Sequence, residues 1–277
     1  MQISDINGTV TLHNGVEMPY FGLGVYKTNN GKEVVDAVTY ALDAGYRHID
    51  TAAAYFNEEG VGTAIRHHHV SRKDLFITSK VWNSDQGYDT TIASFNESLK
   101  RLGTDYLDLF LQHWPVKGKY KATWRAMETL YKAGRVRAIG VSNFLQFQLE
   151  DLMSSAEIMP MVDQVEFHPF LTQPDLQEFT RQHHVQFESW FPLMHGEAMK
   201  IQLFQELAGV YNVTIPQLLI RWNLQKGVVV IPKSIHKDRI ISNAEVFDFS
   251  IREEDMRLLD SLNRNYRLGP DPDNFNF

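Results

Sequence analysis

Four residues of this sequence combine a phenol, a cation, a carboxylate and an imidazole: Tyr55, Lys80, Asp50 and His113. A carbonyl group that accepts a hydride gains negative charge on its oxygen, and that oxygen needs a proton in the transition state. Tyr55 is suited to donate it, and because a free phenol has a pKa of about 10, a nearby cation such as Lys80 assists the transfer. Asp50 would hold Lys80 charged and oriented, and His113 would hydrogen-bond the substrate oxygen. The four types together predict a proton-donating active site.

These residues lie at or just beyond the ends of short apolar runs. Such runs alternate with amphipathic helical stretches, a pattern typical of a parallel sheet with crossover helices. Strands that are buried on both faces indicate an α/β fold of the closed (β/α)8 or TIM barrel type, whose functional side chains gather at the carboxyl ends of the strands. The predicted strands are residues 18–22, 46–50, 75–80, 107–113, 136–142, 161–166, 185–189 and 228–232.

Apolar residues at helical spacing predict helices between the strands, among them 32–44, 90–102 and 124–133. Two helices, 201–211 and 215–226, are expected between the last two strands, so one of them is extra to the eightfold pattern.

Turn and cap signals mark two further features. Asn14-Gly15 predicts an N-terminal β-hairpin that closes the bottom of the barrel. The segment Thr214-Ile-Pro-Gln217 predicts a capping box at a helix start. Because barrels of about 250 residues commonly form one domain, we expect a single domain over residues 1–277.

Composition excludes several classes of protein. The 277 residues include 43% hydrophobic residues and carry a formal net charge of -7, with no run of Lys and Arg that would indicate a nucleic-acid partner. The chain has no cysteine, which excludes disulfides and thiolate metal sites. Residues 1–10 lack a signal-peptide pattern, and no apolar run approaches the roughly 20 residues that span a bilayer. We therefore expect a cytoplasmic monomer without a membrane partner.

Two short motifs carry little weight. His67-His68-His69 lies at a predicted helix end, where adjacent side chains point in different directions, so we expect no metal site. Gly22-Leu-Gly24 begins like a dinucleotide-binding fingerprint but lacks the third glycine, so it does not predict a Rossmann fold.

The segments around the four candidate catalytic residues resemble the signature segments of the aldo-keto reductase family. The resemblance extends over essentially the whole chain and implies a reductase of aldehydes, ketones or dicarbonyls that uses NADPH/NADP+, with Tyr55 as the general acid. Taken singly, each position also fits a structural role, such as a snorkelling surface lysine or a helix N-cap aspartate. The matching segments are GYRHIDTAAAY (45–55), FITSKVW (76–82) and LFLQHWP (109–115).

The segment VVVIPKSIHKDRIISN (228–243) resembles the part of the family that binds the adenosine end of the cofactor. It runs from the last strand into a helix, and a helix N-terminus near cations suits a phosphate. The resemblance implies that Lys233, Ser234 and Arg239 contact the 2′-phosphate and that Asn243 contacts the adenine. A basic helix start that faces solvent is the alternative.

Three other segments resemble strand ends of the family that hold the nicotinamide. The resemblance assigns the carboxamide to Ser142, Asn143 and Gln164, and it places Leu193 among the cofactor contacts. Trp190 would stack on one face of the nicotinamide, which makes hydride delivery one-sided and implies transfer of the pro-R hydrogen. Ser and Asn after a strand are often only turn formers, whereas a buried Gln amide requires partners. The segments are VSNF (141–144), QVEFHP (164–169) and ESWFPL (188–193).

The substrate pocket is expected to be aromatic, with Tyr26, Trp82 and Trp114 as walls and Phe56 at its entrance. Core or rim packing is the alternative for these rings. Phe191 departs from the family pattern, in which a small residue lies near the ribose and pyrophosphate.

Two segments that differ among relatives are short here. They are the stretch between Trp114 and Trp124 and the tail 263–277, and they predict a substrate site that is more open than in relatives with long capping loops. In this respect the chain resembles the prokaryotic branch of the family, which includes 2,5-diketo-D-gluconate reductases and glyoxal or methylglyoxal reductases. Ser242, where a Glu is common at the adenine, is a further departure from the family pattern.

Two other functions are compatible with the same fold. One is a regulatory protein that binds NADPH with little turnover, and the intact set of four residues argues against it. The other is a lyase or aldolase that uses Lys80 as a Schiff-base nucleophile, which needs an uncharged amine. A neighbouring Asp50 would keep that amine protonated.

Overall fold

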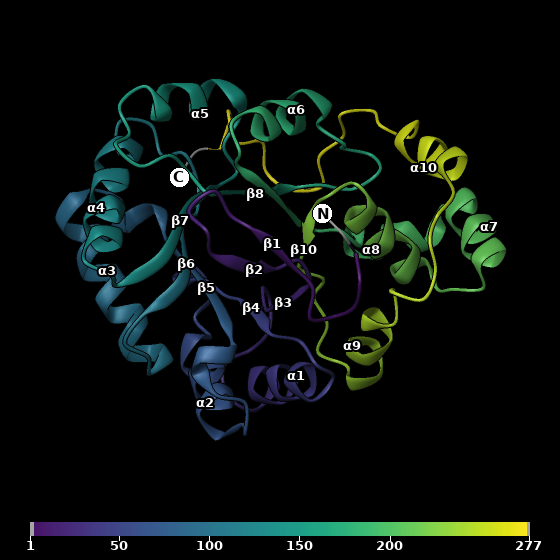
Figure 1. Cartoon of the computed structure of the whole chain (residues 1–277), viewed down its shortest axis with the longest axis horizontal. Coiled ribbons are helices and arrows are strands. Elements are labelled where there is room, and N and C mark those ends of the chain that lie inside the picture. Colours follow the sequence, from purple (N-terminus) through teal and green to yellow (C-terminus); the bar gives the residue numbers. More distant parts are fainter. Residues whose placement is uncertain (1–2, 276–277) are drawn as a thin grey trace.

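Eight parallel strands form a barrel in the computed structural model, which describes residues 3–275 (Figure 1). Neighbouring strands follow chain order, and a parallel bridge between Phe21 and Val230 joins the last strand to the chain before the first. The predicted TIM barrel is confirmed; residues 1, 2, 276 and 277 of the expected domain lie outside the described residues. The strands are β3 Gly22–Gly24, β4 His48–Asp50, β5 Phe76–Val81, β6 Leu107–Gln112, β7 Val136–Ser142, β8 Val162–Glu166, β9 Gln186–Trp190 and β10 Val229–Val230.

Helices surround the barrel; α1 to α8 connect successive strands, and α9 and α10 follow the last one (Figure 1). Both α7 and α8 lie between β9 and β10, as predicted, and no helix within residues 3–275 is long and apolar enough to span a membrane. The helices are α1 Lys32–Asp43, α2 Glu58–His67, α3 Tyr88–Leu102, α4 Tyr120–Lys132, α5 Gln146–Met153, α6 Pro174–Gln182, α7 Gln202–Tyr211, α8 Ile215–Gln225, α9 Lys237–Ala244 and α10 Glu253–Asp260, with short 3-10 turns η1 Ala53–Tyr55, η2 Arg72–Asp74, η3 Asn83–Asp85 and η4 Met194–Lys200.

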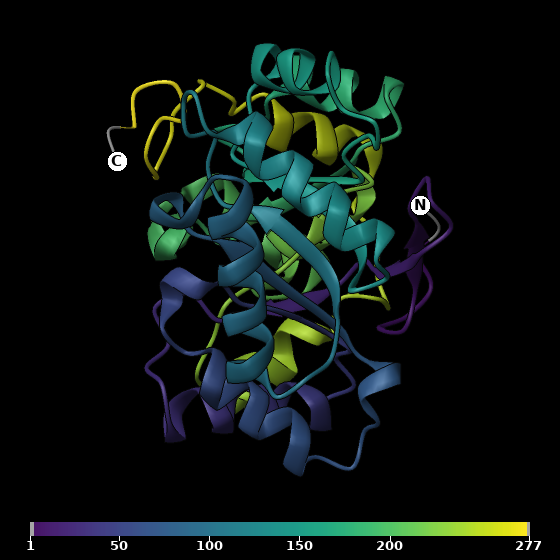
Figure 2. The ribbon, with the colours of Figure 1, turned by 90° about the vertical axis from the view of Figure 1, so that its left-hand side faces the viewer.

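The N-terminal hairpin and the capping box are both present. Strands β1 Thr9–Thr11 and β2 Glu17–Pro19 pair antiparallel. Nδ2 of Asn14 in their turn donates to the carbonyl oxygen of Arg137, which lies at the start of β7. The hairpin therefore covers the amino-terminal end of the barrel, on the side away from the C-terminal segment (Figure 2). At α8, Thr214 and Gln217 exchange the two hydrogen bonds of a capping box.

Most predicted boundaries differ from the structure by no more than two residues, and two differ in ways that have a physical reason. The run 18–22 is divided between β2 and β3, because Tyr20 and Phe21 are buried while the chain passes from the hairpin into the barrel. Helix α4 begins at Tyr120 instead of residue 124, since its first turn is largely polar and gives no apolar periodicity.

Candidate active site

A cavity of about 470 Å³ lies at the carboxyl ends of the barrel strands, the end at which functional residues of such barrels gather. Most of the predicted site residues contribute to its wall. The predicted residues that line it are Tyr26, Asp50, Tyr55, Phe56, Trp82, His113, Trp114, Ser142, Asn143, Gln164, Trp190, Leu193 and Lys233.

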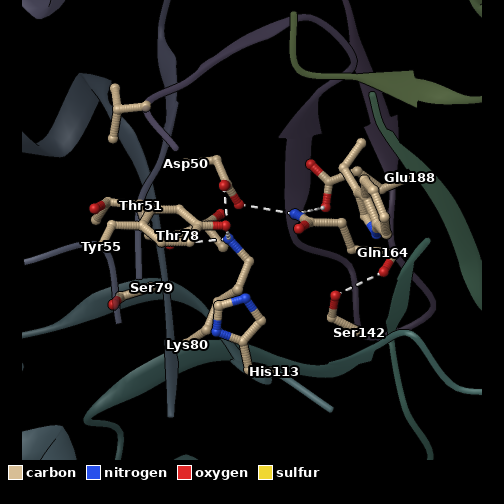
Figure 3. Close-up of polar contacts among 12 residues, drawn as sticks. Asp50, Thr51, Tyr55, Thr78, Ser79, Lys80, His113, Ser142, Gln164 and Glu188 are labelled. Carbon is tan, nitrogen blue, oxygen red and sulfur yellow. Dashed lines mark hydrogen bonds and ion pairs between the residues drawn. The ribbon is translucent and has the colours of Figure 1, made fainter. Parts of the chain in front are cut away.

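Lys80 lies fully buried beneath the cavity and organises the catalytic candidates. Its Nζ donates to Oδ1 of Asp50 over 2.6 Å, to the carbonyl oxygen of Thr51 over 2.9 Å, and to the hydroxyl of Tyr55 over a long 3.5 Å (Figure 3). The three N–H donors of an ammonium group are thus directed at three oxygens. Strand ends position this group, since Asp50 ends β4 and Lys80 lies near the end of β5.

The phenol of Tyr55 retains its proton strongly in this environment. Burial raises the pKa of Tyr55 well above its ordinary value of 10.0, and the negative charge of Asp50 adds to this effect. The sequence led us to expect that Lys80 would assist by lowering this pKa. The net shift is nevertheless upward, because Nζ of Lys80 lies closer to Asp50 than to Tyr55 and the removal of the phenol from water has the larger effect.

His113 follows β6 and faces Tyr55 edge to face, with ring centroids 5.6 Å apart. Burial lowers the pKa of His113 well below 6.5, and the positive charge of Lys80 lowers it further, so the imidazole is neutral. Its Nδ1 is buried and finds no hydrogen-bond partner among the residues that the structure describes. A bare lone pair is less costly there than an unpaired N–H, which favours the proton on Nε2.

A chain of hydrogen bonds connects the four residues predicted to hold the nicotinamide. Nε1 of Trp190 donates to Oδ1 of Asn143 over 2.9 Å, and Nδ2 of Asn143 donates to Oγ of Ser142 over 3.1 Å. Oγ of Ser142 donates in turn to the carbonyl oxygen of Gln164 over 2.7 Å (Figure 3). Ser142, Gln164 and Trp190 come from β7, β8 and β9, Asn143 directly follows β7, and the four residues share one wall of the cavity.

Phe191 lies beside Trp190 in the wall of the cavity. It has a left-handed backbone with φ of 57°, which is rare for a bulky residue. Its ring centroid lies 4.6 Å from that of Trp190 and 3.5 Å from that of His195. The departure from the family pattern therefore places an aromatic ring in the cavity wall itself.

The residues predicted to bind the 2′-phosphate lie on the segment from β10 to α9. Lys233 lines the cavity, and Oγ of Ser234 accepts a hydrogen bond from the backbone N–H of His236 over 3.1 Å. Arg239 and Asn243 are four residues apart in α9 and thus share one face of it. Within residues 3–275, the side chain of Arg239 makes no hydrogen bond or ion pair, so its guanidinium is available to an anion.

The C-terminal segment closes part of the cavity. The backbone N–H of Leu268 donates to the buried carboxyl group of Glu166 over 2.5 Å. Beyond this contact, Pro270 and Phe275 line the cavity, and the ring of Phe275 stacks on Trp114 with centroids 4.5 Å apart. The C-terminal segment therefore forms part of the wall of the substrate site.

The consecutive histidines lie away from this cavity. His67 ends α2, Nε2 of His68 lies 3.0 Å from Oδ1 of Asp43, and the rings of His68 and His69 are 4.2 Å apart. Among residues 3–275, no group of three or more His, Cys, Asp or Glu side chains is arranged to hold a metal ion.

Besides the apolar residues of the C-terminal segment, sequence reasoning missed three charged or titratable residues at the site. Lys27 and His195 line the cavity together with Lys233, and burial followed by the charge of Lys27 lowers the pKa of His195 below 6.5. Glu188 lies behind the wall, hydrogen-bonded to Gln164. The sequence gives no distinct signal for these residues, because the strand of Glu188 also contains Gln186 and Ser189 and because Lys27 and His195 follow no periodic pattern.

The chain matches a family model described as the aldo/keto reductase family over residues 8–264. It is 55% identical to the glyoxal reductase of Bacillus subtilis (strain 168) over 274 residues, which cover 99% of each chain. It is 42% identical to the methylglyoxal reductase DkgA of Escherichia coli (strain K12) over 270 residues, 96% of this chain and 97% of that relative.

Solved structures agree with the sequence relatives. MGS-M4, an aldo-keto reductase enzyme from a Medee basin deep-sea metagenome library, superposes with a TM-score of 0.94 at 44% identity and covers 97% of this chain and 100% of its own. A mutant of Gox0644 in complex with NADPH superposes with a TM-score of 0.93 at 39% identity, over 97% of this chain and 98% of its own. This chain belongs to the aldo/keto reductase family.

Proposed function

We propose that this protein reduces small aldehydes, ketones or dicarbonyls to alcohols with NADPH, and that Tyr55 is the general acid. One observation carries the proposal: a single cavity presents the Tyr55 hydroxyl, backed by Lys80 and Asp50, opposite a wall of amide and hydroxyl groups. The names of the relatives, glyoxal reductase and methylglyoxal reductase, support dicarbonyls as substrates. The NADPH complex of Gox0644 supports the cofactor.

The side chains of this cavity fit a nicotinamide cofactor. Oε1 of Gln164, which lines the cavity, accepts no hydrogen bond from the described residues, so it is available to a carboxamide N–H. Trp190 offers an aromatic face beside it. At the other end, Lys233 and Arg239 form no ion pair within residues 3–275 and would hold phosphate groups, with Asn243 nearby at the adenine.

Bound NADPH supplies the hydride, and the residues of this chain handle the charge and the proton. The neutral His113 donates Nε2–H to the carbonyl oxygen and orients it. Tyr55 gives its proton to the same oxygen as negative charge accumulates, because an alkoxide is far more basic than a phenolate even when burial raises the phenol pKa. Lys80 then stabilises the phenolate through its third N–H.

The test is reduction by purified Tyr55→Phe and Tyr26→Phe variants, with glyoxal, methylglyoxal and an aromatic aldehyde as substrates. The ring of Tyr26 lies 5.0 Å from that of Tyr55, so its hydroxyl is a matched control. We expect kcat to fall by about 10² to 10⁴ for Tyr55→Phe, with NADPH affinity within about twofold of wild type. Normal turnover by Tyr55→Phe would remove the assigned role.

The same assay separates the alternative functions. NADPH binding by the wild-type protein without turnover of any carbonyl would favour the regulatory function, and covalent trapping of Lys80 with borohydride would favour the lyase. The hydrogen bond from Lys80 to the Asp50 carboxylate favours a protonated ammonium group, whereas a Schiff base requires an uncharged amine, so it argues against the lyase. We also propose that residues 1–277 act as one domain; the monomeric state and the cytoplasmic location stay predictions.

A further inference from the structure

The amide of Gln164 is held from two sides by carboxyl groups. Its Nε2 donates to Oδ2 of Asp50 over 2.8 Å and to Oε2 of Glu188 over 3.0 Å (Figure 3). Asp50 reaches the amide across the barrel lumen from β4, whereas Glu188 is the direct partner of Gln164 in the register of β8 and β9. Both N–H groups of the amide are therefore engaged by different strands.

This double contact fixes which end of the amide faces the cavity. An amide has two N–H donors and one carbonyl acceptor, and once both donors of Gln164 are directed at carboxyl oxygens, Oε1 remains for a ligand. If one carboxyl acceptor were missing, the amide could rotate and present an N–H to the cavity instead. Nicotinamide carries a carboxamide whose NH₂ needs an acceptor, so this orientation determines how the cofactor is held.

Glu188 is suited to hold this contact without adding a charge to the site. Burial raises its pKa to about 8, and the charge of Asp50 contributes, which favours the neutral carboxylic acid near pH 7. The charged and titratable groups that face it are Asp50, Lys80, Tyr55 and His48, whose Nε2 lies 3.8 Å from Oε1 of Glu188. Within residues 3–275, Oε1 of Glu188 makes no hydrogen bond.

We propose that Glu188 is a positioning residue, which holds the Gln164 amide with its carbonyl oxygen toward the cavity and thereby fixes the nicotinamide of the cofactor. This inference rests on the proposed function, because it uses Gln164 as the ligand of the carboxamide. Glu188 itself does not line the cavity. Its effect on the reaction is therefore indirect, through Gln164.

The test compares Glu188→Met, which removes the acceptor at similar volume, with Glu188→Gln, which keeps an acceptor oxygen. Fluorescence titration gives the dissociation constants of NADPH and NADH for each variant. We expect both constants to rise by about 5-fold to 10-fold in Glu188→Met and by less than about 2-fold in Glu188→Gln, because one hydrogen bond to a buried group is at stake. Equal losses for the two cofactors are expected, since they share the nicotinamide.

A double-mutant cycle tests whether Glu188 acts through Gln164. In a Gln164→Ala background, Glu188→Met should weaken NADPH binding no further. A second measurement uses NADPH deuterated at either face of the nicotinamide: the wild type should transfer deuterium from one face, and Glu188→Met should transfer a measurable fraction from the other. A purely structural role of Glu188 would not change the face of transfer.

The outcomes separate the inference from the proposed function. The inference alone is overturned if Glu188→Met binds NADPH with wild-type affinity or if its loss of affinity adds to that of Gln164→Ala. It is also overturned if Glu188→Gln loses as much affinity as Glu188→Met. If the wild-type protein binds neither NADPH nor NADH, the proposed function fails and the inference fails with it. If Glu188→Met does not fold, the cycle is made with Glu188→Ala, and the same comparison with Glu188→Gln decides.

Discussion

Nζ of Lys80 donates to Oδ1 of Asp50 over 2.6 Å, and neither side chain exposes more than 2% of its surface. Two charges removed from water to this extent are tolerated only because each compensates the other and both have further hydrogen bonds. Asp50 accepts a second one from Gln164, and Lys80 donates another to Thr51. The pair therefore connects the proton-donating half of the site to the cofactor half.

Removal of one partner of this pair should destabilise the fold strongly. We expect Asp50→Asn to lower the free energy of unfolding by about 3 to 5 kcal/mol, because it leaves the Lys80 ammonium uncompensated in the barrel. The double variant Asp50→Asn with Lys80→Met should recover most of this loss while remaining inactive. Urea unfolding at pH 7 measures both, and equal stabilities of the single and double variants would contradict the expectation.

Glu188 should make stability fall as pH rises. Its pKa is raised from 4.5 to about 8 by burial, with a contribution from the charge of Asp50. The folded state thus binds one proton more than the unfolded state between these values, and the stabilisation is full below 4.5 and lost as pH rises through 8. Relative to Glu188→Gln, the wild-type free energy of unfolding should decrease by up to about 1.4 kcal/mol per pH unit between pH 5 and 8. Urea unfolding measures this free energy at each pH, and the same pH dependence in both proteins would contradict the prediction.

The strands and the group of four catalytic candidates were predictable because each depends on local sequence. Asp50 and Lys80 come at the ends of apolar runs, and the ends of parallel strands meet at one side of a barrel. The position of Glu188 was not predictable in this way. Its contact with Gln164 depends on the register of two strands, and the approach of Asp50 depends on the closure of the barrel.

The raised pKa of Tyr55 was hidden from the sequence for a related reason. Proximity to a lysine is evident from the segments around Tyr55 and Lys80, but the pKa depends on how deeply the phenol is buried and on which partner the lysine prefers. The position of the C-terminal segment in the cavity wall was not predictable either. It depends on a hydrogen bond between Leu268 and Glu166, which lie far apart in the chain.

Glu166 should control the substrate side of the cavity. Its carboxyl group accepts backbone N–H bonds from Leu268 and Gly269, which hold the segment that carries Phe275. We expect Glu166→Ala to raise KM for the carbonyl substrate by about 10-fold, since such bonds contribute about 1.5 to 3 kcal/mol, and to leave NADPH affinity within about twofold. The exposed ion pair of Glu178 offers a control, Glu178→Ala, which should change neither constant. An unchanged substrate KM in Glu166→Ala would show that the segment stays in place without this contact.

Arg239 should discriminate NADPH from NADH. Its exposed guanidinium has no acidic partner within residues 3–275, and NADPH differs from NADH by a single phosphate that such a group binds well. We expect Arg239→Ala to raise KM for NADPH by about 10-fold or more and KM for NADH by less than about 2-fold. Lys237→Ala removes a charge from the first turn of the same helix and serves as the matched control for a general electrostatic effect. If both cofactors lose affinity equally in Arg239→Ala, or if Lys237→Ala has the same effect, the 2′-phosphate is not the group that Arg239 recognises.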